Sequence, residues 1–137
     1  MQLVVLGLNH KTVPVDIREQ FAISPDSARS GLIHLDEQEG VEEAVVLSTC
    51  NRTEIYAVLK DETAKETLYD FFLALSGNSE AKDEYFFYFE GEACIRHLFE
   101  VVSGLDSMVI GESQILNQIK TAYTMALEEK ATRTILN

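Results

Sequence analysis

Cys50 is the residue whose type and setting could perform nucleophilic chemistry. It lies in a short polar run, Thr49-Cys50-Asn51-Arg52, between two apolar, β-branched segments. The thiolate is the reactive form of cysteine, and a free thiol with an ordinary pKa of about 8.5 is only about 3% ionised at neutral pH. A nearby cation such as Arg52, or a helix terminus, would raise that fraction. The same residues are also compatible with a small side chain that only ends a strand.

Cys94 and His97 form a second group of interest, three residues apart in a segment of helical periodicity. Cys94 shares an apolar face with Leu98 and Val101, where a cysteine behaves as a small hydrophobic residue. His97 borders that face, so it is either a hydrogen-bonded structural histidine or a polar group close to the Cys50 thiol. Two potential ligands without clustered partners do not make a zinc site, and we expect no metal.

Two further polar groups are ambiguous. Residues 9–12 (NHKT) follow an apolar run and are equally natural as binding groups or as a solvated loop. Gln114 and Gln118 are spaced to share one face of a helix, which is usually only a solvated face. The chain contains no G-x-G-x-x-G or P-loop pattern, so we expect no nucleotide cofactor site in it.

The elements that would position these residues can be predicted from hydrophobic periodicity. Strands are expected at 2–8, 43–48, 53–59 and 84–89, and helices at 17–21, 62–75 and from Pro25 to about Gln38. Ser24 is the expected N-cap of the helix at Pro25, and Gly40 the expected left-handed residue after it. The order βαββαβ predicts an α+β, ferredoxin-like sandwich, with an antiparallel sheet and helices on one face. Additional C-terminal helices are expected at 92–103 and 112–130, and Cys50 at the tip of the hairpin between the middle strands.

Composition narrows the class of protein. A chain of 137 residues that is 46% hydrophobic has enough apolar side chains for the core of one domain, spanning 1–137. The formal charge of −12 argues against a surface that grips nucleic acid through its phosphates. No apolar run is long enough to span a membrane, and the N-terminus lacks the features of a signal peptide, so we expect a cytoplasmic protein.

Three stretches of the chain resemble signature sequences of one enzyme family. They are residues 7–19 (GLNHKTVPVDIRE), 47–56 (LSTCNRTEIY) and 104–116 (GLDSMVIGESQIL). Together they resemble the N-terminal catalytic domain of the glutamyl-tRNA reductases, and the middle stretch is the most specific. The chain departs from the family pattern at Ser113, where proline is usual, and at Asn117, where glycine is usual.

The resemblance implies a covalent mechanism. Cys50 would attack the ester that joins glutamate to its tRNA and form a thioester, which NADPH would then reduce to glutamate-1-semialdehyde for porphyrin, haem and other tetrapyrrole biosynthesis. His97 would polarise the carbonyl or assist proton transfer. Arg52 suits a bidentate grip on a substrate carboxylate. The glutamyl pocket would be lined by Thr49, Asn51, Arg52, Ser107, Glu112, Ser113, Gln114 and Gln118.

The resemblance also implies that the chain is a fragment. Family members continue into an NADPH-binding domain and a helical dimerisation domain, so NADPH would be bound outside this chain. The full enzyme would be a homodimer, and it could channel its product to glutamate-1-semialdehyde aminomutase. The fragment would form or hydrolyse the thioester but not reduce it. The alternatives are a non-enzymatic ferredoxin-like module that senses a ligand or uses Cys50 as a redox switch, and a pure interaction domain.

Overall fold

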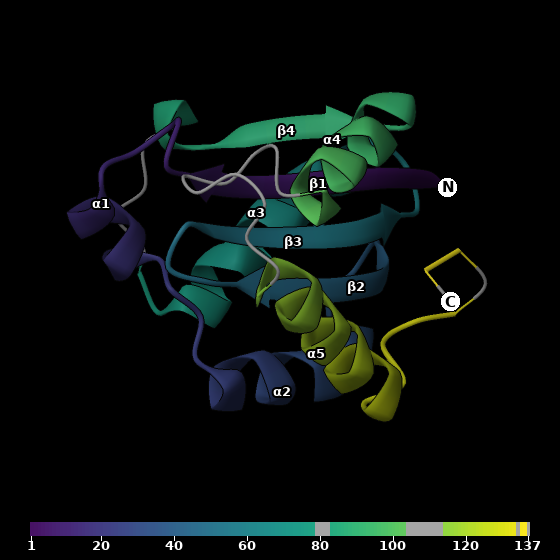
Figure 1. Ribbon diagram of the computed structural model, residues 1–137. Coiled ribbons are helices and arrows are strands. Elements are labelled where there is room, and N and C mark those ends of the chain that lie inside the picture. Colours follow the sequence, from purple (N-terminus) through teal and green to yellow (C-terminus); the bar gives the residue numbers. More distant parts are fainter. Residues whose placement is uncertain (79–82, 104–113, 134, 137) are drawn as a thin grey trace.

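A four-stranded antiparallel sheet forms the centre of the molecule (Figure 1). The computed structural model describes residues 1–78, 83–103, 114–133 and 135–136. The strands are β1 (Gln2–Asn9), β2 (Val41–Ser48), β3 (Arg52–Leu59) and β4 (Phe87–Glu90), in the order β2-β3-β1-β4. The two middle strands, β3 and β1, are paired on both sides, so a side chain of β3 is surrounded by neighbours from both strands that flank it.

The strand register decides which side chains meet on each face. Gly7 of β1 lies opposite Glu54 of β3, and Asn9 lies opposite Arg52. Because side chains alternate between the faces of a sheet, Arg52, Glu54 and Tyr56 all lie on one face of β3. The intervening residues of β3, including Ile55, lie on the other face.

Two helices cover the face to which Ile55 belongs. Helix α2 (Pro25–Ile33) begins as predicted, because the Ser24 hydroxyl accepts a hydrogen bond from the backbone N–H of Ser27. Helix α3 (Lys65–Ser76) follows a short 3-10 turn at Glu62–Ala64 and lies behind the sheet in Figure 1. The main core fills this layer and includes Val4, Leu6, Leu8, Phe21, Leu32, Ile55, Leu68 and Phe72.

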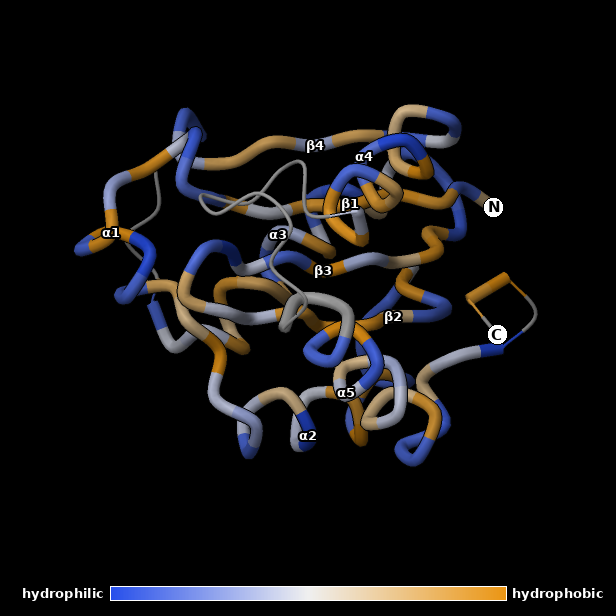
Figure 2. Tube along the Cα trace, in the orientation of Figure 1, coloured by the Kyte–Doolittle hydropathy of each residue, from blue (hydrophilic) through white to orange (hydrophobic). Residues whose placement is uncertain are grey.

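The opposite face is covered by helices α4 (Glu92–Val102) and α5 (Gln114–Glu128), in front of the sheet in Figure 1. The sequence predicted both as additional C-terminal helices, and the described structure places them across the sheet from α2 and α3. Apolar segments follow the strands and the inner sides of the helices, whereas hydrophilic segments lie at the periphery (Figure 2). Within the described residues, no helix is long and apolar enough to cross a membrane.

Several predicted elements differ from the structure by a few residues, and local contacts explain two of these differences. The helix from Pro25 ends at Ile33, and a 3-10 helix at Leu35–Glu37 replaces its last turn, closed by the bond from the Gln38 N–H to the Leu35 carbonyl. The aromatic strand starts only at Phe87, because a 3-10 helix occupies Asp83–Tyr85. The Phe86 ring packs edge-on against Phe72 and Phe21, which takes that residue into the core before the strand begins.

The segment after α5 runs along the outer edge of β2. The backbone N–H of Ala44 donates to the Ala131 carbonyl at 3.0 Å. The buried carboxylate of Glu43 accepts the backbone N–H groups of Arg133, Ile135 and Leu136, all within 3.3 Å. Glu43 and Ala44 together therefore hold the chain beyond the last helix against β2.

Candidate active site

Cys50 lies at the tip of the hairpin between β2 and β3, as the sequence predicted, and its side chain is exposed. The turn is closed by a 2.7 Å hydrogen bond from the Thr49 N–H to the Arg52 carbonyl. The Thr49 hydroxyl also accepts the Asn51 N–H at 3.1 Å. Two of the predicted pocket residues, Thr49 and Asn51, thus help to shape the turn that presents the thiol.

A second segment holds the same turn from outside the hairpin. The His10 N–H donates to the Asn51 carbonyl at 3.1 Å. Arg18, in helix α1 (Val15–Gln20), donates from Nε to the Cys50 carbonyl at 3.3 Å and from Nη1 to the Val13 carbonyl at 2.8 Å. Arg18 lies in the first signature stretch, but its contact with Cys50 spans 32 residues, so no local pattern predicts that it holds this turn.

A buried polar cluster lies on the same strand, inward from the turn. Glu54 is fully buried, and its carboxylate accepts hydrogen bonds from Arg52 Nη1 at 3.1 Å and from Tyr56 Oη at 2.8 Å. His97, on α4, brings Nε2 to within 2.8 Å of the same carboxylate. We call Arg52, Glu54, Tyr56 and His97 the Glu54 cluster. It joins two predicted site residues, Arg52 and His97, to Glu54 and Tyr56, which were not predicted.

The spacing of Arg52, Glu54 and Tyr56 contains a signal that could have revealed the cluster. In a strand, residues two apart share a face, so these three side chains must be neighbours. Arg52 was considered as the cation beside the Cys50 thiol, but its guanidinium donates inward to Glu54. The arginine that contacts the Cys50 backbone is Arg18.

Gly7 makes room for the Glu54 cluster. A Cβ atom at this position would lie 2.8 Å from Glu54 Cγ and 2.8 Å from the Thr53 carbonyl oxygen, closer than real contacts allow. The glycine that opens the first signature stretch therefore permits a carboxylate in the centre of the sheet.

The two cysteines differ in exposure to solvent. Cys94 is buried on the apolar face of α4, as predicted. Burial, together with the nearby Glu54 carboxylate, raises the pKa of the Cys94 thiol to about 12. The pKa of the Tyr56 hydroxyl is also strongly raised by burial and by Glu54. Only Cys50 presents a thiol to solvent.

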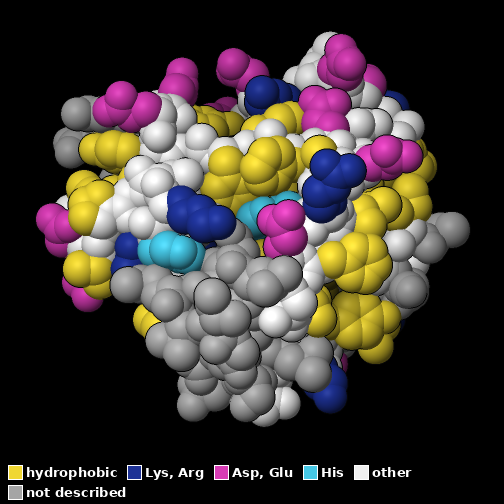
Figure 3. Space-filling view, turned by 45° about the horizontal axis from the view of Figure 1, so that its top comes forward, with side chains coloured by type: hydrophobic (Ala, Val, Ile, Leu, Met, Phe, Trp, Pro, Cys, Tyr) yellow, Lys and Arg dark blue, Asp and Glu magenta, His cyan; other side chains and the backbone are white. Residues whose placement is uncertain are grey.

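A polar and aromatic cavity of about 330 Å³ lies beside the Glu54 cluster. Figure 3 shows basic, histidine and hydrophobic side chains around a hollow on this side of the molecule. The cavity lies between the loop after β1, the strand β4 and the helix α4. It is lined by Asn9, Lys11, Thr12, Phe87, Phe89, Ala93, Arg96, His97 and Glu100.

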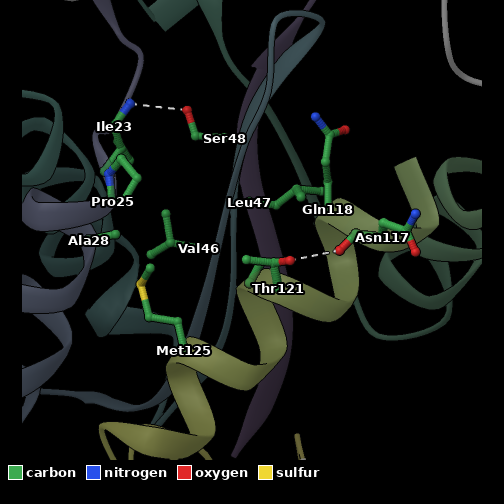
Figure 4. A pocket seen from close by; sticks show the side chains of 11 residues that line it. Ile23, Pro25, Ala28, Val46, Leu47, Ser48, Asn117, Gln118, Thr121 and Met125 are labelled. Carbon is green, nitrogen blue, oxygen red and sulfur yellow. Dashed lines mark hydrogen bonds between the residues drawn. The ribbon is translucent and has the colours of Figure 1, made fainter. Parts of the chain in front are cut away.

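Gln118 lines a different cavity, of about 260 Å³, between α2, the end of β2 and α5 (Figure 4). Ser48, two residues before Cys50, borders the same space and accepts the Ile23 N–H at 3.1 Å. Gln118 and Thr121 come from α5 on the other side of the cavity (Figure 4). Of the other predicted pocket residues, Ser107, Glu112 and Ser113 lie outside the described residues, as does the side chain of Gln114.

The described part of the chain contains no cluster of three or more His, Cys, Asp or Glu side chains that could hold a metal ion. What it offers instead is an exposed thiol on a turn fixed from two sides, next to a buried cluster that contains an arginine, a carboxylate and a histidine. Such a site can present a nucleophile to a substrate.

Comparison with known proteins gives a consistent result. Residues 6–137 match the sequence model of the family described as "Glutamyl-tRNAGlu reductase, N-terminal domain". Proteins described as glutamyl-tRNA reductases from Pelobacter propionicus and Rubrobacter xylanophilus are 45% and 46% identical over the whole chain, which spans 32% of each. The solved structure of glutamyl-tRNA reductase from Methanopyrus kandleri superimposes on 96% of the chain, with 29% identity and a TM-score of 0.73. The chain covers 29% of that structure and so spans about a third of the length of its relatives.

Proposed function

Because the chain belongs to the glutamyl-tRNA reductase N-terminal domain family, we propose that its Cys50 accepts the glutamyl group of glutamyl-tRNA as a thioester. One observation carries the proposal. Of the two thiols in the chain, Cys50 is exposed on a turn whose backbone is fixed by Thr49, His10 and Arg18, whereas Cys94 is buried. A rigid turn holds the nucleophile in one position, which is what positioned covalent catalysis requires.

The proposed step is an acyl transfer. The sulfur of Cys50 attacks the ester carbonyl carbon, the bond from that carbon to the ribose oxygen breaks, and the thiol proton ends on the departing 3′-terminal hydroxyl. No electrons are transferred in this step. The product is a Cys50 thioester, which reacts with a second nucleophile more readily than the original ester does.

Arg52 and His97 are the proposed partners of the substrate at this site. Arg52 is buried with its guanidinium bonded to Glu54, and we propose that it also grips a carboxylate of the glutamyl group, the kind of group that a guanidinium binds with two parallel N–H donors. His97 would polarise the carbonyl or assist proton transfer. Its bond to Glu54 fixes the ring against the sheet. Thr49, Asn51, Ser107, Glu112, Ser113, Gln114 and Gln118 are proposed to complete the glutamyl pocket.

The whole protein would then be a longer, NADPH-dependent enzyme of tetrapyrrole biosynthesis. The sequence contains no G-x-G-x-x-G or P-loop pattern. We propose that NADPH binding, homodimer formation and any channelling to an aminomutase depend on other parts of that protein. We also propose that the sheet with α2 and α3 is a ferredoxin-like unit, supported by the strand order β2-β3-β1-β4.

The test is acyl capture by the chain. Wild type, Cys50→Ser and Cys94→Ser are incubated with glutamyl-tRNA radiolabelled in the glutamate, and the denatured protein is analysed for bound label. We expect label on wild type and on Cys94→Ser, none on Cys50→Ser, and release of the label by neutral hydroxylamine, which cleaves thioesters. Loss of label with Cys94→Ser alone would contradict the proposal. A Cys50 that reacts with peroxide but never acquires label would instead favour the redox-sensing alternative.

A further inference from the structure

The cavity beside His97 has a combination of side chains that suits one nucleotide. We propose that it binds the 3′-terminal adenosine of the tRNA whose glutamyl group reaches Cys50, an inference that rests on the proposed function. Binding of this adenosine would allow the site to distinguish glutamyl-tRNA from other glutamyl esters. Every tRNA ends in an adenosine, and the amino acid is esterified to the ribose of that nucleotide, so the adenine must lie close to the reacting ester.

An aromatic platform forms one wall of the cavity. Phe87 and Phe89 stack with ring centroids 5.3 Å apart, and the His97 ring lies 4.8 Å and 5.2 Å from them. Phe89 keeps 36% of its surface exposed although it lies on a strand. Exposed aromatic faces stack on bases of any sequence, which is how proteins hold single-stranded nucleic acid ends.

The rest of the lining is charged and polar. Lys11 and Arg96 both line the cavity, in a chain with 23 acidic and 11 basic residues. Two cations at one cavity match the single phosphate that links the terminal nucleotide to the next. Glu100 adds an acceptor of the kind that binds an amino group on a base, and it disfavours a second phosphate. The chemistry therefore fits one nucleotide with a single phosphate and an amino group on its base, as in a terminal adenosine.

The cavity is connected to the nucleophile through a shared loop. Asn9 and Thr12 line the cavity, and His10, between them, donates its N–H to the Asn51 carbonyl next to Cys50. Asn9 also pairs with Arg52 in the sheet. A ligand in the cavity thus contacts the same loop that supports the turn carrying the thiol.

Two substitutions test the cavity, with matched controls. Phe89→Ala and Arg96→Ala remove the exposed ring and one cation, whereas Phe99→Ala and Lys120→Ala remove an exposed ring and a cation that do not line the cavity. Binding of adenosine 5′-monophosphate is followed through the NMR signals of the histidine rings. We expect binding to wild type and to both controls, and about tenfold weaker binding to each cavity variant. No binding to wild type, or equal binding to all variants, would overturn the proposal.

The rate of Cys50 acylation then distinguishes this inference from the proposed function. Each variant is reacted with glutamyl-tRNA and with a small glutamate α-thioester that carries no nucleotide. We expect Phe89→Ala to slow acylation by glutamyl-tRNA about tenfold and to leave the small thioester unaffected. Equal slowing with both substrates, or binding of the free nucleotide without any effect on the tRNA reaction, would overturn the terminal-adenosine assignment. If Cys50 reacts with neither substrate in wild type, the proposed function fails instead.

Discussion

Glu54→Gln is the substitution that most directly probes the buried cluster. Gln has almost the same shape as Glu but no charge, so the Arg52 guanidinium, which is buried with it, loses the charge of one carboxylate partner. Removing one partner of a buried ion pair costs about 3–5 kcal/mol, because the other charge stays buried. The side-chain NH2 group introduced by Glu54→Gln would also face a hydrogen-bond donor instead of an acceptor, because Arg52 and Tyr56 both donate to the Glu54 carboxylate.

The assay is urea unfolding followed by circular dichroism. With a slope of about 2 kcal/mol per M urea, the expected loss moves the midpoint down by about 2 M. Tyr56→Phe removes one hydrogen bond to the carboxylate and should cost about 2 kcal/mol. Glu66→Gln, on the exposed side of α3, is the control and should change the stability by less than about 0.5 kcal/mol.

The double variant Arg52→Met/Glu54→Leu removes both charges together. Replacing a whole buried ion pair by apolar residues is often close to neutral, so this variant should be more stable than Glu54→Gln. If Glu54→Gln shifted the midpoint by less than about 0.5 M urea at an unchanged slope, or if the double variant were the less stable of the two, the charge of Glu54 would not be what holds Arg52.

Three further predictions concern single residues. Burial raises the pKa of Cys94 to about 12, so only about one Cys94 thiol in ten thousand is ionised at pH 8. A thiol reagent should therefore modify only Cys50 in the folded protein, and Cys94 should react once urea unfolds it. Modification of both cysteines in the folded protein would contradict this prediction. Gly7→Ala forces a methyl group against Glu54 and should cost about 1–3 kcal/mol, measured by thermal unfolding. Arg18→Ala removes two hydrogen bonds to backbone carbonyls and should lower the free energy of unfolding by about 2 kcal/mol. It should also speed hydrogen exchange of the backbone amides in the turn at Cys50. Unchanged exchange in this turn would show that Arg18 does not hold it.

The strands and the position of Cys50 could be predicted from the sequence because their signals are local. Residues 43–48 and 53–59 are runs rich in β-forming residues with a short polar turn between them, and this pattern predicts the hairpin directly. The Glu54 cluster could not be predicted from local sequence patterns alone. Its β3 members share a face by alternation, but the contact of His97 depends on how α4 packs across the sheet, 43 residues away in sequence.

Long-range packing also explains what the sequence did not reveal elsewhere. Arg18 lies in a six-residue helix, and only the fold brings it to Cys50. The spacing of Gln114 and Gln118 predicts that they share one helix face. In the structure, Gln118 lines the cavity beside Ser48, whereas His97 lines the other cavity, between β4 and α4. Periodicity assigns a residue to a face of its own helix, but it does not say which cavity that face borders.

The contacts of Glu43 have a consequence for solubility. Strands β2 and β4 are the two edges of the sheet, and an open edge offers unpaired N–H and carbonyl groups to any other chain. The edge at β4 is only four residues long, while β2 is twice that length and is shielded by the segment that Glu43 and Ala44 hold. A chain cut before Ala131 would keep its helices and lose this shield, and its β2 would be the place where two molecules pair and aggregation starts.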